Sequence, residues 1–521
     1  MVDIKKSEKK VLEWIKDPHR SFIIVVAVIM LSIRLYYFFV TWDQPVWWDE
    51  GDYLNIARMW AFGTPSWDIN PLRPLLLPLM LATMFKAHLP EMIMRLVPFV
   101  SSIVAIILTY LIGKELYNKH VGLIAALMLS SFWSFTFFSY RLLVDVPVAT
   151  LWLLGVWLFV KGYDHKKKWA LWLCIPVIVL AFLMKFTGAL LGFILIAYLL
   201  VTDKLKPLKN KDLWISLGLG VLAALPFLIY EIKKFGHPFA FYVSAIGGRA
   251  ESPRSLWQTL MDYINTTFPH VHYAFLTLFI IGIALLLIEL TIGFDLLWKN
   301  KEKKLKSNLL VLLTFLIPFL YIVSIGYGTY IEERYLFLMY PFMFIIAGKG
   351  LMSIFDHVKR YNKAIAIAIV VAFLAIGFYQ NMIHTNKVID EKSMSFIQVK
   401  QAGQWIKEHS SPEDKIYSYH TQAELQYAAV REVRGIPGNS PEELIEAMKK
   451  DKPKYIVMNI FANINAANEW KIVFPYINQH IFKPEISYRP FIDEEQKIPI
   501  LTVFSINPAI YTANVSSREQ V

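Results

Sequence analysis

A succession of apolar segments separated by short basic loops constrains this chain more than any other feature of its sequence. Eleven segments are apolar enough to be membrane spans, although several are shorter than the ~20 residues that a spanning helix needs. They are residues 21–40, 92–113, 121–138, 144–160, 169–184, 187–201, 213–230, 273–292, 309–327, 335–347 and 364–378. Because 56% of the residues are hydrophobic and only 18% are charged, the pattern predicts a polytopic α-helical membrane protein.

The basic residues predict how this bundle is oriented. With a cytoplasmic N-terminus, the lysine-rich short loops fall on one face, provided that residues 74–85 do not span the membrane. That stretch is short and carries Pro74 and Pro78, which is typical of an interfacial or re-entrant segment. The same loops explain the net charge of +12 without a nucleic-acid partner. We expect a multi-pass protein of the cell membrane.

Unusual charged residues fall on the opposite, outer face of this topology. They are Asp49 and Glu50 in the first outer loop (residues 42–91), Arg73 in the same loop, Asp145 at the outer start of the fourth span, Lys185 between the fifth and sixth spans, and Arg334 before the tenth. Charges beside the apolar part of a membrane are costly unless they are solvated, paired or used. The sequence therefore predicts that these acids and bases share a cavity at one mouth of the bundle.

The last part of the chain has the composition of a soluble domain. Helices are expected at 395–409, 421–429 and 441–450, and strands at 415–419, 455–460, 486–488 and 500–506. Residues 1–385 are thus predicted to form a transmembrane module, and residues 386–521 an extracytoplasmic α/β domain that covers the outer mouth.

The outer charges suit the transfer of a group from a lipid phosphate. Asp49 or Glu50 can act as a general base, because a carboxylate beside an apolar wall has a raised pKa. Arg73, Lys185 and Arg334 can bind phosphate oxygens and stabilise a phosphate leaving group. The sequence contains no glycine-rich nucleotide loop.

Each of these residues also has a simpler interpretation. Lys185 is placed like a lysine that anchors the end of a span at the membrane interface. Asp145 stands two residues before Pro147, as a helix N-cap would. Arg334 follows Glu333, with which it could form a local ion pair. The argument for a site therefore depends on the combination of residues and not on any one of them.

The order of these residues resembles the GT-C superfamily of membrane glycosyltransferases, and within it the branch of the protein O-mannosyltransferases and the lipid A aminoarabinose transferase. The resembling motifs are Asp49-Glu50-Asp52-Tyr53, Arg73-Pro74, Asp145 with Pro147, Lys185–Gly188 and Glu333–Pro341, within residues 22–381. The resemblance implies that Asp49 is catalytic, with Glu50 beside it. It associates Arg73, Lys185 and Arg334 with a polyprenyl phosphate, although lysine is commoner than arginine at position 73. Tyr53, Asp145 and Tyr335 are further candidates for substrate binding.

The resemblance implies an inverting transferase on the non-cytoplasmic side of the membrane. Its donor is a dolichyl- or undecaprenyl-phosphate monosaccharide, and its acceptor is a hydroxyl on a protein, a glycan or a lipid. No cofactor is expected, with a divalent metal left open as the alternative; the spacing of His237, His270 and His272 fits no zinc pattern. The competing interpretations are a polytopic transporter or lipid flippase, which would more naturally show internal symmetry, and a noncatalytic scaffold.

Overall fold

The structure is a computed structural model and describes residues 18–247, 255–298, 302–325, 332–437, 440–459, 473, 477, 481–488 and 500–511. The chain divides into two compact units. The helical unit consists of Met1–Asp43 and Arg95–Asp390, and the mixed unit of Gln44–Met94 and Glu391–Val521.

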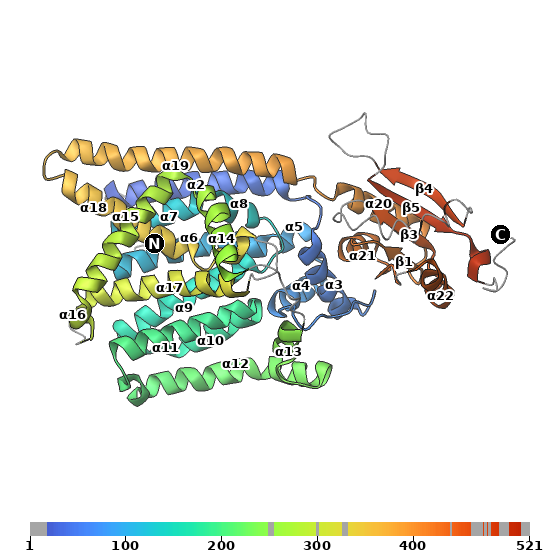
Figure 1. Cartoon of the computed structure of the whole chain (residues 1–521), viewed down its shortest axis with the longest axis horizontal. Helices are drawn as coiled ribbons and strands as arrows, with labels where there is room; N and C mark the ends of the chain where they lie inside the picture. Colours follow the sequence, from blue (N-terminus) through green and yellow to red (C-terminus); the bar gives the residue numbers. More distant parts are fainter. Residues whose placement is uncertain are drawn as a thin grey trace, which may run out of the picture. The chain divides into compact units, whose positions relative to one another are not determined.

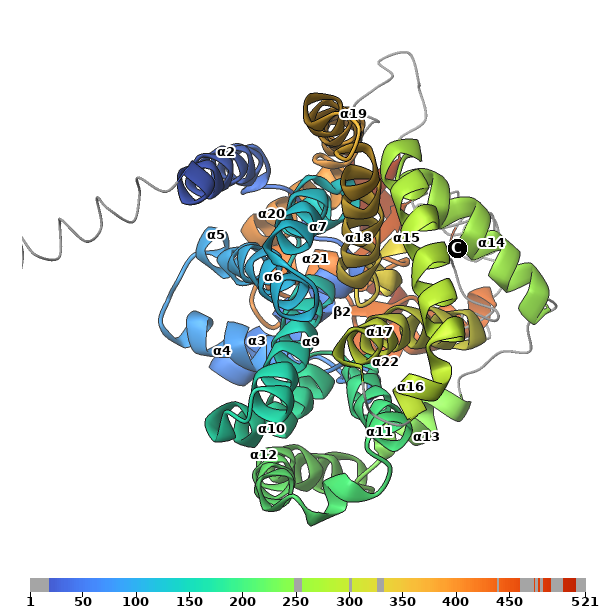
Figure 2. The same cartoon turned by 90° about the vertical axis from the view of Figure 1, so that its left-hand side faces the viewer.

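The helical unit is a bundle of apolar helices, labelled in Figure 1 and seen end-on in Figure 2. Its elements are α2 (Pro18–Thr41), α6 (Leu96–Leu116), α7 (Lys119–Ser131), α8 (Trp133–Phe138), α9 (Asp145–Phe159), η1 (Val160–Asp164), α10 (Lys168–Met184), η2 (Phe186–Ala189), α11 (Leu190–Thr202), η3 (Lys206–Lys209), α12 (Lys211–Phe235), α13 (Ala240–Gly247), α14 (Leu256–His270), α15 (Tyr273–Ile292), α16 (Phe294–Trp298), α17 (Lys303–Ile325), η4 (Glu333–Leu336), α18 (Tyr340–Val358) and α19 (Lys363–Lys392).

Seven helices in the described ranges are long and apolar enough to cross a membrane. They are Glu91–Leu116, Asp145–Asp164, Lys211–Phe235, Tyr273–Ile292, Lys303–Ile325, Tyr340–Val358 and Lys363–His409. Shorter apolar helices cover Ala27–Thr41, Leu76–Lys86, Lys119–Ser131, Lys168–Met184 and Phe186–Thr202. Every predicted apolar segment overlaps one of these helices, so the predicted fold class is confirmed: a polytopic helical protein with a small α/β domain. Leu76–Lys86, which the sequence predicted not to span, belongs to the mixed unit.

Three predicted segments differ from the observed helices at their ends. The segment 121–138 is two helices, α7 and α8, because Phe132 between them has extended backbone angles. The segment 335–347 begins in η4 and continues in α18 to Val358. The segment 364–378 is the first half of α19, which runs on to Lys392.

A buried lysine explains why the end of α18 is hard to read from the sequence. The Lys349 ammonium group donates to Glu289 Oε2 on α15 at 2.7 Å and to Asn308 Oδ1 on α17 at 3.1 Å. Asn308 Nδ2 also donates to Glu289, at 2.7 Å. A buried charge is tolerated where it is paired and hydrogen-bonded. Lys349 therefore joins three helices instead of ending one.

The helices α15 and α18 approach closely where each presents a glycine to the other. A Cβ atom at Gly282 would lie 2.0 Å from the Ile346 carbonyl oxygen, and one at Gly350 would lie 2.4 Å from that of Leu278. No side chain fits in such a gap. These two positions set the spacing of the pair, which Figure 2 shows side by side.

The mixed unit is built on a five-stranded sheet in the order β2-β1-β3-β5-β4. Its strands are β1 (Lys415–Ser418), β2 (Glu432–Gly435), β3 (Tyr455–Asn459), β4 (Phe482–Tyr488) and β5 (Leu501–Ile506). β1 is parallel to β2 and β3, whereas β5 is antiparallel to β3 and β4. Its helices are α3 (Trp48–Phe62), α4 (Leu76–Lys86), α5 (Glu91–Met94), α20 (Ile397–His409), α21 (Gln422–Ala429), α22 (Pro441–Asp451) and η5 (Pro508–Tyr511).

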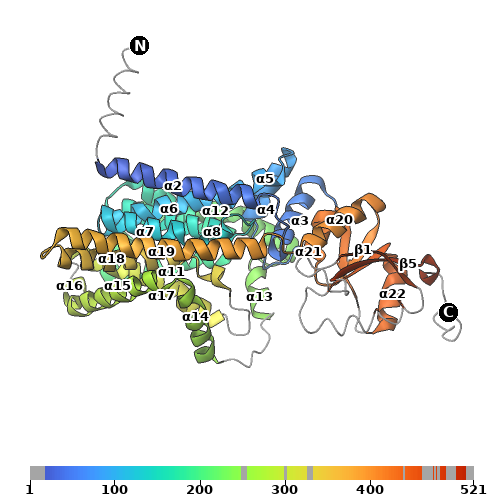
Figure 3. The ribbon, with the colours of Figure 1, turned by 90° about the horizontal axis from the view of Figure 1, so that it is seen from above.

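Hydrophobic cores lie on both faces of this sheet, and Figure 3 shows α20 and α22 on opposite sides of it. On one face, α20 and α21 bury Ile406 and Leu425 against strand residues such as Val457. On the other, α22 buries Leu444 against strand residues such as Ile456. Because Ile456 and Val457 are neighbours in β3, this is the alternation that a two-sided strand requires. The predicted strand β3 is thus buried on both sides.

The first long loop of the sequence folds onto this domain through α3. A Cβ atom at Gly51 would lie 2.7 Å from the backbone of Ala423, so α3 and α21 are in close backbone contact. Asn55 donates to the Ala423 carbonyl oxygen at 2.8 Å, and Arg58 to that of Tyr427 at 2.8 Å. The mixed unit therefore combines two stretches that almost 300 residues of the chain separate.

Candidate active site

The acidic pair at the start of α3 consists of two residues with different environments. Glu50 is fully buried, and its Oε2 accepts a hydrogen bond from the Trp47 backbone N–H at 2.8 Å. This hydrogen bond satisfies a backbone N–H at the helix start, where no carbonyl of the helix itself can accept it. The Asp49 side chain is 24% exposed instead. Glu50 thus stabilises the helix that presents Asp49.

Arg73 joins Asp49 to a second aspartate one turn further along α3. Its NH1 donates to Asp49 Oδ1 at 2.7 Å, and its NH2 is paired with Asp52 Oδ2. The guanidinium carbon lies 5.8 Å from the centre of the Tyr53 ring. One planar cation thereby fixes two carboxylates, as arginine does better than lysine. We call Asp49, Asp52 and Arg73 the acid cluster.

The charges of the acid cluster act on one another. Burial raises the pKa of Asp52, and the Asp49 carboxylate raises it further, while Arg73 opposes both effects. Burial lowers the pKa of Arg73, but Asp49 and Asp52 outweigh burial and raise it overall. Arg73 is consequently a permanent cation. Its charge lets Asp49 and Asp52 lie close together, because a cation between two carboxylates offsets their mutual repulsion.

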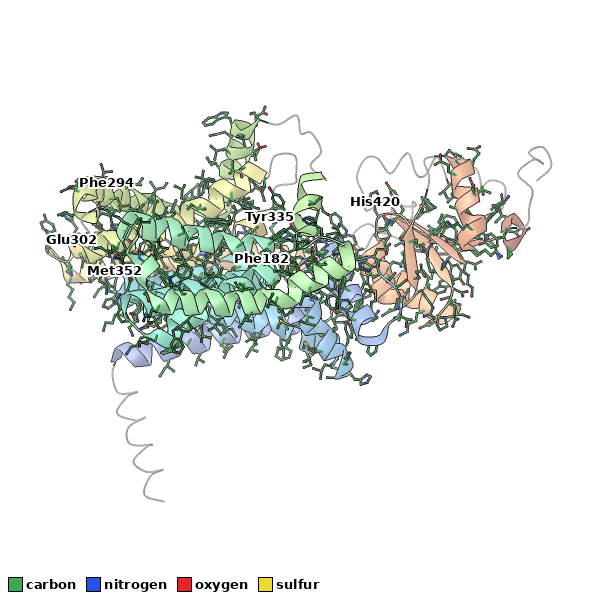
Figure 4. The ribbon with its side chains drawn as sticks, turned by 90° about the horizontal axis from the view of Figure 1, so that it is seen from below. Phe182, Phe294, Glu302, Tyr335, Met352 and His420 are labelled. Carbon is green, nitrogen blue, oxygen red and sulfur yellow. The ribbon has the colours of Figure 1, made fainter. Side chains whose placement is uncertain are left out.

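A cavity of about 780 Å³ opens beside the acid cluster within the mixed unit. Its walls are Trp48, Asp52, Ser66, Trp67, Asp68, Arg73, His420, Gln422, Ala423, Glu424, Glu432, Val433, Arg434 and Gly435. His420 is labelled in Figure 4. A concave space of this size, lined by aromatic and polar groups, is typical of a site for a small ligand.

Glu424 of α21 is a buried carboxyl group of this cavity that the sequence did not single out. Only 4% of it is exposed, and its Oε1 has no hydrogen-bond partner in the part of the chain that the structure describes. Burial and the nearby Asp52 and Asp49 raise the pKa of Glu424 to about 8. The order of residues in α21 does not identify Glu424 as buried, because Glu424 faces α3 only when the mixed unit is folded.

The helical unit holds a second charged group, built on Asp145. Lys185 Nζ donates to Asp145 Oδ1 at 2.6 Å, and Arg334 NH1 lies 3.6 Å from Asp145 Oδ2. The Asp145 side chain is only 2% exposed, against 20% for Lys185 and 13% for Arg334. Two cations thus share one buried carboxylate. We call these three residues the basic cluster.

Tyr335 supports both cations of the basic cluster. Its ring centre lies 4.9 Å from Lys185 Nζ and 5.4 Å from the Arg334 guanidinium carbon, and Figure 4 labels it. A cation over an aromatic face is attracted by the ring quadrupole. The turn η4 places Arg334 and Tyr335 next to each other, and the break between α10 and η2 places Lys185.

The simpler interpretations of these residues can now be compared with the contacts. The N-cap of α9 is Val144, and the Asp145 carboxylate binds Lys185. Arg334 pairs with Glu332, whereas the predicted partner Glu333 pairs with His270. Lys185 is paired with a buried carboxylate, whereas a lysine that only anchors the end of a span would need no such partner.

Seven of the eight predicted site residues therefore lie in one of two groups. Asp49, Arg73 and Tyr53 belong to the acid cluster or its aromatic contact, and Asp145, Lys185, Arg334 and Tyr335 to the basic cluster and its ring. The eighth, Glu50, serves the helix start. Whether the two groups act in one cavity stays a prediction. Within the described ranges, no group of three or more His, Cys, Asp or Glu side chains is arranged to hold a metal ion.

The chain is similar to known membrane glycosyltransferases. The family described as dolichyl-phosphate-mannose-protein mannosyltransferase matches residues 72–230, which include Arg73, Asp145 and Lys185. No curated protein sequence matches the chain.

Solved structures share the fold at low sequence identity. ArnT from Cupriavidus metallidurans superposes with a TM-score of 0.63 in the apo state and 0.62 when bound to undecaprenyl phosphate, at 14% and 15% identity. Each match covers 93% of this chain and 98% of ArnT. The oligosaccharyltransferase of Archaeoglobus fulgidus in its apo form has a TM-score of 0.61 at 14% identity, over 96% of this chain and 77% of its own. The chain is thus similar in sequence to this mannosyltransferase family over residues 72–230, and similar in fold to ArnT and to the oligosaccharyltransferase.

Proposed function

We propose that this protein transfers a monosaccharide from a polyprenyl-phosphate donor to an acceptor hydroxyl, with inversion at the sugar carbon. The acceptor oxygen attacks C1 of the sugar, the bond from C1 to the phosphate oxygen breaks, and the polyprenyl phosphate leaves with the bonding electrons. Asp49 takes the acceptor proton. The observation that carries the proposal is the partly exposed Asp49, fixed by Arg73 beside a cavity, in a fold shared with ArnT, which has been solved with undecaprenyl phosphate bound.

The basic cluster supplies the phosphate site. Lys185 and Arg334 are held by the buried Asp145, which keeps both cations in place while it neutralises only one of them. The second neutralising carboxylate is Glu332, whose side chain is 38% exposed. An exposed glutamate can swing out into solvent, so a donor phosphate can take its place on the Arg334 guanidinium. The forked geometry of arginine suits both anions.

Arg73 acts on the base and not on the phosphate. Both of its terminal nitrogens are engaged with Asp49 and Asp52, so it orients the Asp49 carboxylate. The sequence associated Arg73 with the lipid phosphate, and the observed ion pairs favour the positioning role. Glu50 stabilises the start of α3 and takes no part in the chemical step. Metal independence stays a prediction.

The reaction takes place on the non-cytoplasmic side, with the N-terminus in the cytoplasm. The lysine-rich short loops support this orientation by the positive-inside rule. The donor is a polyprenyl-phosphate monosaccharide of the dolichyl or undecaprenyl class. An oligosaccharyltransferase of the same fold has been solved in complex with a dolichol-phosphate, and that likeness supports this donor class.

Transfer from a purified donor tests the proposal. The full-length protein in nanodiscs is supplied with a polyprenyl-phosphate sugar and a mixture of acceptors, and both the released lipid phosphate and the product are measured. Asp49→Asn keeps the shape of the side chain but cannot take a proton, so we expect kcat to fall by about 100-fold or more. Donor binding should persist, because the basic cluster is unchanged.

Asp356→Asn is the matched control. Asp356 is an exposed residue of α18 that pairs locally with Lys359, and its replacement should leave the rate unchanged. A rate for Asp49→Asn within a few-fold of the wild type would refute the assignment of the base. Movement of the donor across a membrane without sugar transfer would instead favour the transporter.

A further inference from the structure

The cavity beside the acid cluster has no excess of cations to offer a ligand. Its two guanidinium groups are both occupied: Arg73 binds Asp49 and Asp52, and Arg434 binds Glu432 at 2.6 Å and Asp451 at 2.7 Å. The walls carry four carboxyl groups, those of Asp52, Asp68, Glu424 and Glu432. An anionic ligand would meet these acids before it met a cation without a partner carboxylate. The charge balance therefore disfavours a phosphorylated or carboxylated acceptor.

The walls of the cavity include two tryptophans, the residue type on which sugar rings commonly pack. Trp48 is 57% exposed and is held edge-on against Phe396, with ring centres 6.0 Å apart. Trp67 is fixed by a side-chain hydrogen bond to Asp52. The C–H face of a pyranose ring packs on an indole ring, and the hydroxyl groups at its edge need hydrogen-bond partners. Asp52, Asp68 and Gln422 line the same cavity and can supply carboxylate and amide oxygens to such hydroxyl groups.

The edge of the sheet at this cavity is not open for a peptide strand. β2 is the outermost strand on that side and lines the cavity, which is the place where a peptide could add to the sheet. However, the Val433 backbone N–H already donates a hydrogen bond to Gln426 Oε1 at 2.9 Å. Gln426 is buried and in turn donates to the Ser66 carbonyl oxygen at 2.9 Å. A bound peptide strand would have to break this chain of hydrogen bonds.

We propose that this cavity is the acceptor site of the transferase and that its ligand is a neutral, hydroxyl-rich glycan. The sugar ring packs on Trp48 and Trp67, and its hydroxyl groups pair with Asp52 and Gln422. The acceptor hydroxyl thereby lies beside the carboxylates that Arg73 holds. The inference rests on the proposed function in one respect: only if the protein is a transferase is the bound glycan an acceptor. The binding of a neutral glycan, however, can be measured without any transfer.

Direct binding to the full-length protein tests the inference in the absence of donor. Labelled protein in nanodiscs is applied to a printed panel of neutral glycans, sialylated glycans and serine- and threonine-containing peptides. We expect binding to members of the neutral set alone. Trp48→Ala should weaken that binding by about tenfold, which corresponds to the loss of one aromatic platform. Trp42→Ala is the control, since Trp42 is similarly exposed, at 47%, and does not line the cavity.

Three results would overturn the inference: no binding to any neutral glycan, binding to the peptides or the sialylated glycans that Trp48→Ala weakens, or equal effects of Trp48→Ala and Trp42→Ala. Asp49→Asn separates this inference from the proposed function. It should bind the neutral glycan as the wild type does while it fails to transfer sugar. Glycan binding without transfer by the wild type would contradict the function only, and transfer to a peptide without glycan binding would contradict the inference only.

Discussion

At the scale of single residues, the two charged clusters use arginine and lysine in different ways. Arg73 holds two carboxylates that are both partly exposed, which suits the proposed role of Asp49 as the base. Lys185 and Arg334 converge on the almost fully buried Asp145. In the proposed mechanism, Arg334 keeps the buried Asp145 as its partner and exchanges the exposed Glu332 for the donor phosphate.

This difference predicts opposite effects for two substitutions that touch Arg334. Glu332→Gln removes the competitor of the donor phosphate, so the KM for the donor should fall by about threefold while kcat stays unchanged. Arg334→Gln removes the phosphate partner, and the KM should rise by about tenfold or more. Steady-state kinetics at several donor concentrations measure both values.

The control for these variants is Lys359→Gln, which breaks an exposed local ion pair with Asp356 and should change neither constant. A higher KM for Glu332→Gln would mean that this carboxylate positions Arg334 for the donor. The role of an exchangeable partner would then be wrong.

At the scale of elements, the apolar helices could be predicted and their polar contacts could not. Segment hydropathy located the helices of the bundle, since burial in lipid requires a continuous run of apolar residues. The boundary at Val358 was hidden because Lys349 is neutralised by Glu289, a residue 60 positions away. The strand β2 was missed because only Val433 of its four residues is buried, which leaves no alternating pattern to detect.

The helix α21 illustrates the same limit for the site. Its eight residues were predicted as a helix, but its contact with α3 depends on Gly51 and Ala423, which no sequence period connects. That contact buries Glu424 next to Asp52. A buried carboxyl group with a raised pKa makes the free energy of unfolding depend on pH.

Stability should fall as the pH rises through the range set by Glu424. In the folded protein its pKa is raised to about 8, from an ordinary value of 4.5. Between these values the folded state holds a proton that the unfolded state has lost. This contribution is complete below pH 4.5 and is lost as the pH rises through 8, by up to about 1.4 kcal/mol per pH unit. Thermal unfolding midpoints across this range measure the trend.

Glu424→Gln is neutral at every pH and should flatten this trend, with its largest relative stabilisation at the alkaline end. Glu413→Gln, at an exposed position of the same unit, should leave the trend as it is. Other groups near Glu424 also titrate, so the difference between variant and wild type is the quantity to compare. An unchanged slope for Glu424→Gln would show that this carboxyl is ionised throughout the range.

At the scale of the whole molecule, the chain assembles its mixed unit from two distant stretches. The sequence grouped residues 42–91 with the transmembrane module because they follow the first span directly. The structure joins Gln44–Met94 to Glu391–Val521, through contacts such as that of Asn55 with Ala423. The position of a loop in the sequence determines which span it follows. The surface on which the loop packs depends on residues that are distant in the sequence.

The orientation of the chain gives the last prediction. Cys174 is the one cysteine of the sequence and is buried, so Cys174→Ala provides a background for single labels. In intact cells, a membrane-impermeant maleimide should label Glu413→Cys in the mixed unit. Lys167→Cys, in the exposed turn before α10, should react only after the membrane is opened. Both follow from cytoplasmic lysine-rich loops. Labelling of Lys167→Cys in intact cells would reverse the orientation and would place the transfer reaction in the cytoplasm.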